Sequence, residues 1–183
     1  MYAIGICGSP KNNGNTAFLL KYTLDAVECD ERKFITLGDK KIEPCDGCNR
    51  CLVEDKCVKD DDMQALYDEL RKADIIILGA PTYFGGVPAK LKAFMDRTHY
   101  LYNNSELKDK VGAAVVVMEA EAGDLVVSSI ATFFTQHEML FAGGIVGIGS
   151  SQNEVKRDLK AVRNAIALGK RASEIARFRK VNP

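Results

Sequence analysis

The segment Asp74-Ile-Ile-Ile-Leu-Gly79 constrains the fold more than any other part of the sequence. Its apolar residues are continuous rather than alternating, which is the pattern of a strand in a parallel sheet with helices on both faces. Four more strands are predicted at residues 2–6, 33–37, 111–118 and 141–148, separated by segments with helical character. Five strands alternating with five helices predict an α/β domain with a doubly wound, five-stranded parallel sheet.

Capping and periodicity set the expected helices. Asn15 and Thr16 are predicted to cap the first helix. Three consecutive acids are predicted to cap the second helix and to carry solvated charge: Asp60, Asp61 and Asp62. The last helix is predicted to bury one apolar face, formed by Val155, Leu159, Val162 and Ile166. His99 and His137 are far apart in sequence and are each predicted to be structural, without a shared site.

The loop after the first strand has the composition of a phosphate site. In a doubly wound sheet, ligands bind beyond the carboxyl ends of the strands, where the strand order reverses. This loop lacks both Gly-x-Gly-x-x-Gly and the Gly-Lys-Ser/Thr ending of ATP-type loops. It offers Ser9, Asn15 and Thr16 as side-chain donors, Lys11 as a positive charge, and the amides of a helix N-terminus. These groups favour a mononucleotide such as FMN, although a turn that only caps the helix would use the same residues.

The segment Pro81-Thr-Tyr-Phe-Gly-Gly-Val-Pro88 directly follows the clearest strand. Tyr83 and Phe84 can lie against a flat ring, and Gly85 lets backbone amides approach the polar edge of that ring. An isoalloxazine ring requires both kinds of contact. Aromatic residues that only pack a turn would give the same pattern, but two compatible loops at one edge of the sheet favour a flavin site.

Charge and patterning exclude several classes of partner. The chain carries 25 Lys plus Arg and 25 Asp plus Glu, and this zero net charge argues against nucleic acid. No apolar run is long enough to cross a bilayer, and the N-terminus lacks a basic region and a cleavage signal. We therefore expect a cytoplasmic protein with no membrane partner, in which thiols stay reduced and clustered cysteines have metal or redox roles.

Four of the six cysteines follow the spacing C-x2-C-x2-C-x5-C: Cys45, Cys48, Cys51 and Cys57. Three cysteines at every third residue can wrap a loop around one cuboidal cluster, and bacterial ferredoxins use the same spacing for three ligands. Gly47 gives this loop the freedom that a tight turn needs. Zinc sites more often use two C-x-x-C pairs separated by a longer loop. The spacing predicts a [4Fe–4S] cluster, with zinc or an empty thiol site as alternatives.

Three motifs together resemble the iron–sulfur flavoproteins of the flavodoxin-like, NADPH-dependent FMN reductase superfamily. They are Gly-Ser-Pro-Lys-x-x-Gly-Asn-Thr at 8–16, the cysteine run at 45–57, and Pro-Thr-Tyr-Phe-Gly-Gly-Val-Pro-Ala-x-Leu-Lys-x-Phe-x-Asp-Arg at 81–97. The resemblance covers nearly the whole chain. It implies one flavodoxin-like, FMN-binding, three-layer α/β/α domain over residues 1–183, with a cysteine-rich insertion at about 44–59.

The same resemblance implies which residues hold the cofactors. Four residues match the family's phosphate loop, in which many relatives carry Arg at the position of Lys11: Ser9, Lys11, Asn15 and Thr16. Five match its flavin-ring loop: Pro81, Thr82, Tyr83, Phe84 and Gly85. The four cysteines would hold the cluster, and no side chain is expected to be catalytic, because the flavin does the chemistry. The third loop, residues 119–124, departs from relatives because it is acidic rather than rich in glycine.

The leading hypothesis is an electron-transfer flavoprotein that uses FMN and a [4Fe–4S] cluster. By resemblance, electrons would come from ferredoxin and pass to oxygen, peroxide or a quinone. Resemblance also implies a homodimer or homotetramer, with the cluster of one chain close to the flavin of its neighbour. One alternative is an NAD(P)H-dependent FMN or quinone reductase whose cysteines hold zinc or nothing. A second alternative is a non-catalytic redox carrier or sensor.

Overall fold

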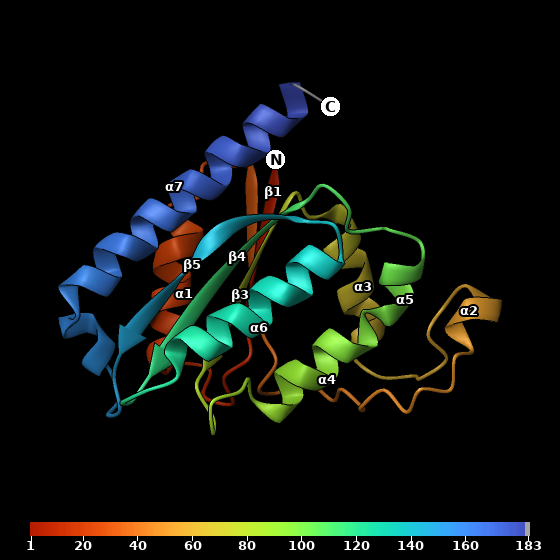
Figure 1. Ribbon diagram of the computed structural model, residues 1–183, viewed down its shortest axis with the longest axis horizontal. Helices are drawn as coiled ribbons and strands as arrows, with labels where there is room; N and C mark the ends of the chain where they lie inside the picture. The colour runs from red at the N-terminus through yellow and green to blue at the C-terminus, as the bar shows by residue number, and fades with distance from the viewer. Residues whose placement is uncertain (182–183) are drawn as a thin grey trace.

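Five parallel strands form the sheet at the centre of the computed structural model, which describes residues 1–181 (Figure 1). Their order across the sheet is β2-β1-β3-β4-β5. The strands are β1 Tyr2–Cys7, β2 Glu31–Thr36, β3 Ile75–Pro81, β4 Val111–Met118 and β5 Leu140–Ile148. The doubly wound, flavodoxin-like arrangement that the sequence predicts is therefore confirmed, and each strand lies within a few residues of its predicted position.

Helices cover both faces of the sheet and make the three-layer architecture (Figure 1). One face is covered by α1 Asn15–Asp25 and α7 Leu159–Val181. The other is covered by α3 Met63–Lys72, α4 Ala89–Arg97 and α6 Gly123–Gln136. Three short helices complete the fold: α2 Cys51–Glu54, α5 His99–Asn103 and the 3-10 helix η1 Glu154–Arg157. Within residues 1–181, no helix has both the length and the apolar character to cross a bilayer.

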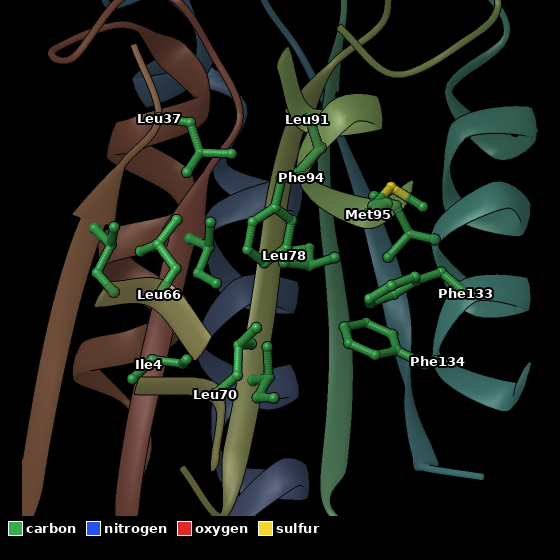
Figure 2. Close-up of a cluster of buried hydrophobic side chains, with 14 of the residues drawn as sticks. Ile4, Leu37, Leu66, Leu70, Leu78, Leu91, Phe94, Met95, Phe133 and Phe134 are labelled. Carbon is green, nitrogen blue, oxygen red and sulfur yellow. The ribbon is translucent and has the colours of Figure 1, made fainter. Parts of the chain in front are cut away.

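The core between the sheet and the second helical layer explains the unbroken apolar runs. Figure 2 shows Leu78 of β3 between side chains of α3 and α4, with Phe94 of α4 close beside it. Ile4 of β1 and Leu70 of α3 extend the same cluster, and all four side chains are at most 1% exposed. Because helices pack on both faces, the central strands have no solvent-facing side that would require polar residues.

Helix α7 differs from its predicted form. Val155 belongs to the separate 3-10 helix η1, and α7 begins at Leu159. The Leu159 side chain is 63% exposed. Of the predicted residues, Val155 is fully buried and Val162 packs against the core, whereas Leu159 and Ile166 are exposed. The buried positions of α7 are small residues, with Leu168 as the exception: Ala161, Ala165, Leu168, Gly169, Ala172, Ser173 and Ala176. These residues let α7 lie close to α1, and this contact is tight enough at Gly169 to leave no room for a side chain.

Gly169→Ala tests this close helix contact. An added Cβ would lie 2.2 Å from the carbonyl oxygen of Thr23 in α1, so one of the two helices would have to move. We expect the free energy of unfolding to fall by about 2 kcal/mol, although alanine favours helix more than glycine does. Urea unfolding monitored by circular dichroism measures this change. Asn164→Ala, at an exposed position of α7, is the control and should change stability little; equal stabilities would contradict the packing account.

Candidate functional site

A pocket lies at the carboxyl edge of the sheet, where the strand order reverses between β1 and β3. The two strands end side by side, and the Gly8 amide donates to the Gly79 carbonyl at 2.7 Å. The pocket has a volume of about 460 Å³. Seven of the predicted cofactor residues line it: Ser9, Lys11, Asn15, Thr16, Pro81, Thr82 and Tyr83. The structure therefore brings together the two loops that were predicted separately.

The phosphate-type loop presents the open N-terminus of α1. Gly14 is the N-cap, its backbone is extended, and no side chain caps the helix. The prediction that Asn15 and Thr16 cap α1 is therefore wrong, because both lie inside the first helical turn. An uncapped first turn leaves backbone amides that attract an anion, reinforced by the helix dipole. Ser9 is buried and its Oγ accepts from the Lys11 amide at 3.1 Å, which fixes the bend of the loop.

Asn15 connects the phosphate-type loop to the loop that follows β5. Its Nδ2 donates to the carbonyl oxygens of Gly149 and Ser151 at 3.2 and 2.8 Å, and its Oδ1 accepts from the Val155 amide at 3.4 Å. The Asn15 side chain is thus occupied by the protein, and it positions the pocket wall. Gly149 and Gln152 line the pocket and were missed by sequence reasoning. The available signal was the Gly-Ser-Ser-Gln turn directly after the fifth strand.

The second loop forms a tight turn between Tyr83 and Gly86. The two residues exchange backbone hydrogen bonds at 3.0 and 2.9 Å, and the residues between them have positive φ, 49° at Phe84 and 73° at Gly85. Tyr83 lines the pocket, whereas Phe84 and Gly85 do not, and the Phe84 side chain is fully exposed. Thr82 also lines the pocket, and its buried hydroxyl is without a hydrogen-bond partner among the described residues.

The acidic third loop contributes less to the pocket than its composition would allow. Val117 at the end of β4 and Glu119 line the pocket. Glu121 and Asp124 are exposed and are absent from its wall. Among the acids of this loop, Glu119 alone lines the pocket, whose wall also includes Lys11 and the N-terminus of α1.

The cysteine segment leaves the body of the protein beside α4 and α5, away from the edge where β1, β3 and β4 end (Figure 1). Its four thiols line one small pocket, together with Arg97, His99 and Tyr100. Gly47 has the positive φ of 67° expected of a tight turn. Within residues 1–181, no group of three or more His, Cys, Asp or Glu side chains is gathered closely enough to hold a single metal ion.

A buried ion pair joins the two ends of this segment. Arg97, at the end of α4, holds Asp61 with two hydrogen bonds of 2.7 and 3.1 Å, and both side chains are at most 1% exposed. Arg97 Nη1 also donates to the Glu43 carbonyl at 2.9 Å, and Asp61 accepts from the Glu43 amide at 2.8 Å. The prediction that Asp61 is solvated is wrong. Burial alone would raise the pKa of Asp61, but hydrogen bonds from Arg97 and two amides hold it below its ordinary value.

Two of the four thiols receive hydrogen-bond donors from the body of the protein. Asn103 Nδ2 of α5 donates to Cys51 Sγ at 3.9 Å, and His99 Nδ1 lies 3.8 Å from the same sulfur. For Cys57, burial tends to raise the pKa of the thiol. The Lys59 amide and Arg97 outweigh burial and lower that pKa, which favours thiolate, the metal-binding form of cysteine. For Cys51, burial instead raises the pKa of the thiol.

His99 and His137 line one groove between α4, α5 and α6, so the expectation of unrelated positions is wrong. The Thr98 hydroxyl donates to the Met95 carbonyl at 2.7 Å, and its oxygen lies 2.8 Å from His137 Nε2. Because that hydroxyl proton is already used, His137 must carry its own proton on Nε2 and donate it to Thr98. Burial, with a smaller repulsion from His99, lowers the pKa of His137 to about 4.

Comparison with known proteins identifies the family. The family model described as NADPH-dependent FMN reductase matches residues 1–153. An iron–sulfur flavoprotein of Methanocaldococcus jannaschii is 39% identical over 190 aligned residues, which cover 97% of this chain and 98% of that protein. The chain belongs to the iron–sulfur flavoproteins of this family.

Solved structures that resemble this iron–sulfur flavoprotein confirm its fold. A flavodoxin, WrbA-like protein from Agrobacterium tumefaciens has a TM-score of 0.67 at 18% identity, with 97% of this chain and 98% of that chain covered. An NAD(P)H:quinone oxidoreductase from Methanothermobacter marburgensis has a TM-score of 0.70 at 14% identity, with 93% and 98% covered. Family membership makes the protein an FMN-dependent oxidoreductase.

The pocket at the sheet edge is suited to the FMN that the family implies. The open N-terminus of α1 and Lys11 are suited to a phosphate group. The buried Thr82 hydroxyl lacks a partner among residues 1–181, which is the kind of group that a bound ligand satisfies. The iron–sulfur flavoprotein therefore has one pocket at the switch point and a separate thiol pocket beside α4 and α5.

The pKa of His137 makes a prediction about stability. The ordinary histidine pKa is 6.5 and the folded value is about 4, so the unfolded chain binds a proton between these pH values that the native His137 does not. Stability should therefore fall as pH falls from 6.5 to 4, by up to about 3 kcal/mol from this residue. Urea unfolding of wild type and His137→Gln at several pH values isolates the effect. Parallel stability curves would contradict it.

Proposed function

We propose that this iron–sulfur flavoprotein carries FMN and a [4Fe–4S] cluster and passes electrons from ferredoxin to a small acceptor such as oxygen, peroxide or a quinone. The observation that carries the proposal is the thiol pocket. Four cysteines with cluster spacing line one pocket, and the segment that bears them is closed at its base by a buried ion pair. When bound, FMN would exchange one or two electrons and the cluster one at a time.

The chain's own residues would bind and orient the flavin. The amides at the start of α1, with Ser9 and Lys11, would hold the phosphate group. Pro81, Thr82 and Tyr83 would contact the ring, and Asn15 would keep the opposite wall in place through its three hydrogen bonds. Thr16, in the first turn of α1, would also contribute to the phosphate site. Phe84 and Gly85 remain proposed ring contacts at the tip of the turn, outside the pocket wall.

The arrangement of the thiols supports a cluster over a single zinc ion. Zinc requires four ligand atoms around one centre, at about 2.3 Å for sulfur. The described cysteines are not gathered in this way, although all four line one pocket. A cuboidal cluster binds each thiolate through a different iron, so it suits ligands that are spread around a space. Its ligands would be the four cysteines Cys45, Cys48, Cys51 and Cys57. The polar groups around Cys51 and Cys57 would stabilise these two ligands, which are the less exposed of the four.

The separation of the two sites supports an assembly of several chains. The cysteine segment lies beside α5, away from the edge where β1 and β3 end (Figure 1). The thiol pocket and the pocket at the sheet edge have no lining residue in common. Phe84 at the FMN pocket, and Leu52 and Val53 in the cysteine segment, are exposed apolar side chains that a neighbouring chain could cover. A homodimer or homotetramer would bring the cluster of one chain to the flavin of another.

The second candidate is an NAD(P)H-dependent FMN or quinone reductase with a zinc-filled or empty thiol site. The observation that favours it is the matched family model, whose description names NADPH as the reductant of its members. The pocket at the sheet edge would then have to admit a nicotinamide ring over the flavin. In that case the thiol pocket would have no part in turnover.

Removal of one cysteine tests whether the two sites are separate. Protein prepared without air should contain stoichiometric FMN and about four iron and four sulfide per chain. Cys48→Ala should lose nearly all the iron and keep FMN, because Cys48 lies outside the FMN pocket. Metal analysis and flavin absorbance measure both contents. Cys29→Ala, at an isolated thiol, is the control and should keep both. Joint loss of iron and FMN from Cys48→Ala, or zinc in place of iron, would count against the proposal.

Stopped-flow reduction separates the two candidate functions. Reduced ferredoxin should reduce the flavin of wild-type protein rapidly, and Cys48→Ala should be at least about tenfold slower because its electrons must bypass the cluster. NADPH should reduce both proteins slowly and at equal rates. Rapid reduction of Cys48→Ala by NADPH would support the second candidate instead. Cys29→Ala again serves as the control and should match wild type with both donors.

A further inference from the structure

One N–H of the Arg97 guanidinium is without a hydrogen-bond partner among residues 1–181. A guanidinium carries five N–H donors. The Nη1 atom donates to Asp61 and to the Glu43 carbonyl, at 2.7 and 2.9 Å. The Nη2 atom donates to Asp61 at 3.1 Å and to the Lys59 carbonyl at 3.5 Å. The remaining donor, Nε, is buried and lacks a hydrogen-bond partner among the described residues.

This unpaired donor belongs to a side chain that lines the thiol pocket. Arg97 and the four cysteines line that pocket together, and Arg97 Nη2 reaches the carbonyl of Lys59, two residues after Cys57. The bidentate contact with Asp61 fixes the plane of the guanidinium, so Nε cannot turn away to find another partner. A buried donor without an acceptor is destabilising because it has lost its hydrogen bonds to water. An acceptor in the cofactor-loaded protein would remove that cost.

We propose that Nε of Arg97 donates a hydrogen bond to the Cys57 thiolate when the cluster is bound, and thereby raises the reduction potential of the cluster. The inference deepens the proposed function and rests on it. Arg97 is a positioning residue here, because it acts on the cluster through Cys57. It would have two effects, since its Nη atoms close the base of the cysteine segment while its Nε acts on the sulfur.

The sign of the effect follows from charge. A reduced cluster carries one more negative charge than the oxidised cluster, so a donor to a ligating sulfur stabilises the reduced state and raises the potential. Asp61 neutralises the charge of Arg97, and both side chains are buried. The oriented N–H, rather than net charge, should therefore produce most of the shift. Arg97→Lys keeps the positive charge and removes Nε–H, which makes it the informative variant.

The experiment is a potentiometric titration, under exclusion of oxygen, of wild type and Arg97→Lys, with the cluster followed by EPR and the flavin by absorbance. We expect the equilibrium constant for cluster reduction to fall about tenfold in the variant, which lowers the midpoint by about 60 mV for a one-electron couple. The flavin midpoint should not move. Lys110→Met, which removes a different part-buried cation bound to the Arg71 and Ala73 carbonyls, is the control and should leave both midpoints unchanged.

A second variant keeps the test decisive if the lysine substitution disturbs folding. Arg97→Gln with Asp61→Asn removes both buried charges together, leaves amides to bridge the segment, and still lacks Nε–H. It should show the same direction of shift. A wild-type midpoint in an iron-containing variant would overturn the inference, as would loss of iron from both variants with FMN and helical content retained. Absence of iron from wild type would instead refute the proposed function itself.

Discussion

The parallel pairing of β1 with β3 is the constraint on which the rest of the molecule depends. Their register joins Ala3 to Ile75 and Cys7 to Gly79, so both strands end at the same level. The strand order places β2 on one side of this pair and β4 on the other. The chain therefore leaves β1 and β3 in opposite directions, and the two loops diverge around an open space. The pocket follows from the topology, and the loops supply only its chemistry.

The cysteine segment depends on a different kind of interaction, because it has little apolar core of its own. Cys45 and Cys48 are exposed, and Leu52 and Val53 of α2 project into solvent. The segment is held at its base by the Arg97–Asp61 pair and the backbone groups that this pair binds. Desolvation makes a buried ion pair a poor source of stability compared with apolar packing. Its value here is geometric, since it brings the two ends of the segment together.

The strands and the two loops that line the pocket at the sheet edge are predictable from sequence because their signals are local: continuous apolar runs, and turn residues at fixed spacing. What could not be predicted depends on side chains that meet only in the folded chain. Arg97 and Asp61 are 36 residues apart, and His99 and Cys51 are 48 apart. Three consecutive acids look like a solvated cap until one of them is found buried. The packed face of α7 was missed because it consists mainly of alanine, which a search for large apolar residues overlooks.

Helix α4 explains why one continuous motif, residues 81–97, contains residues that line both pockets. Its start follows the loop that contributes Pro81, Thr82 and Tyr83 to the pocket at the sheet edge, and Pro88 is its N-cap. Its last residue is Arg97, which closes the cysteine segment and faces the thiol pocket. A helix of nine residues has a length of about 13 Å and does not stretch. The two sites are thus connected by a rigid element rather than by loops. A change at either end of α4 that moved the helix would also move residues of the other pocket. This coupling gives a physical reason for the motif at 81–97 and the cysteine run at 45–57 to occur in one chain.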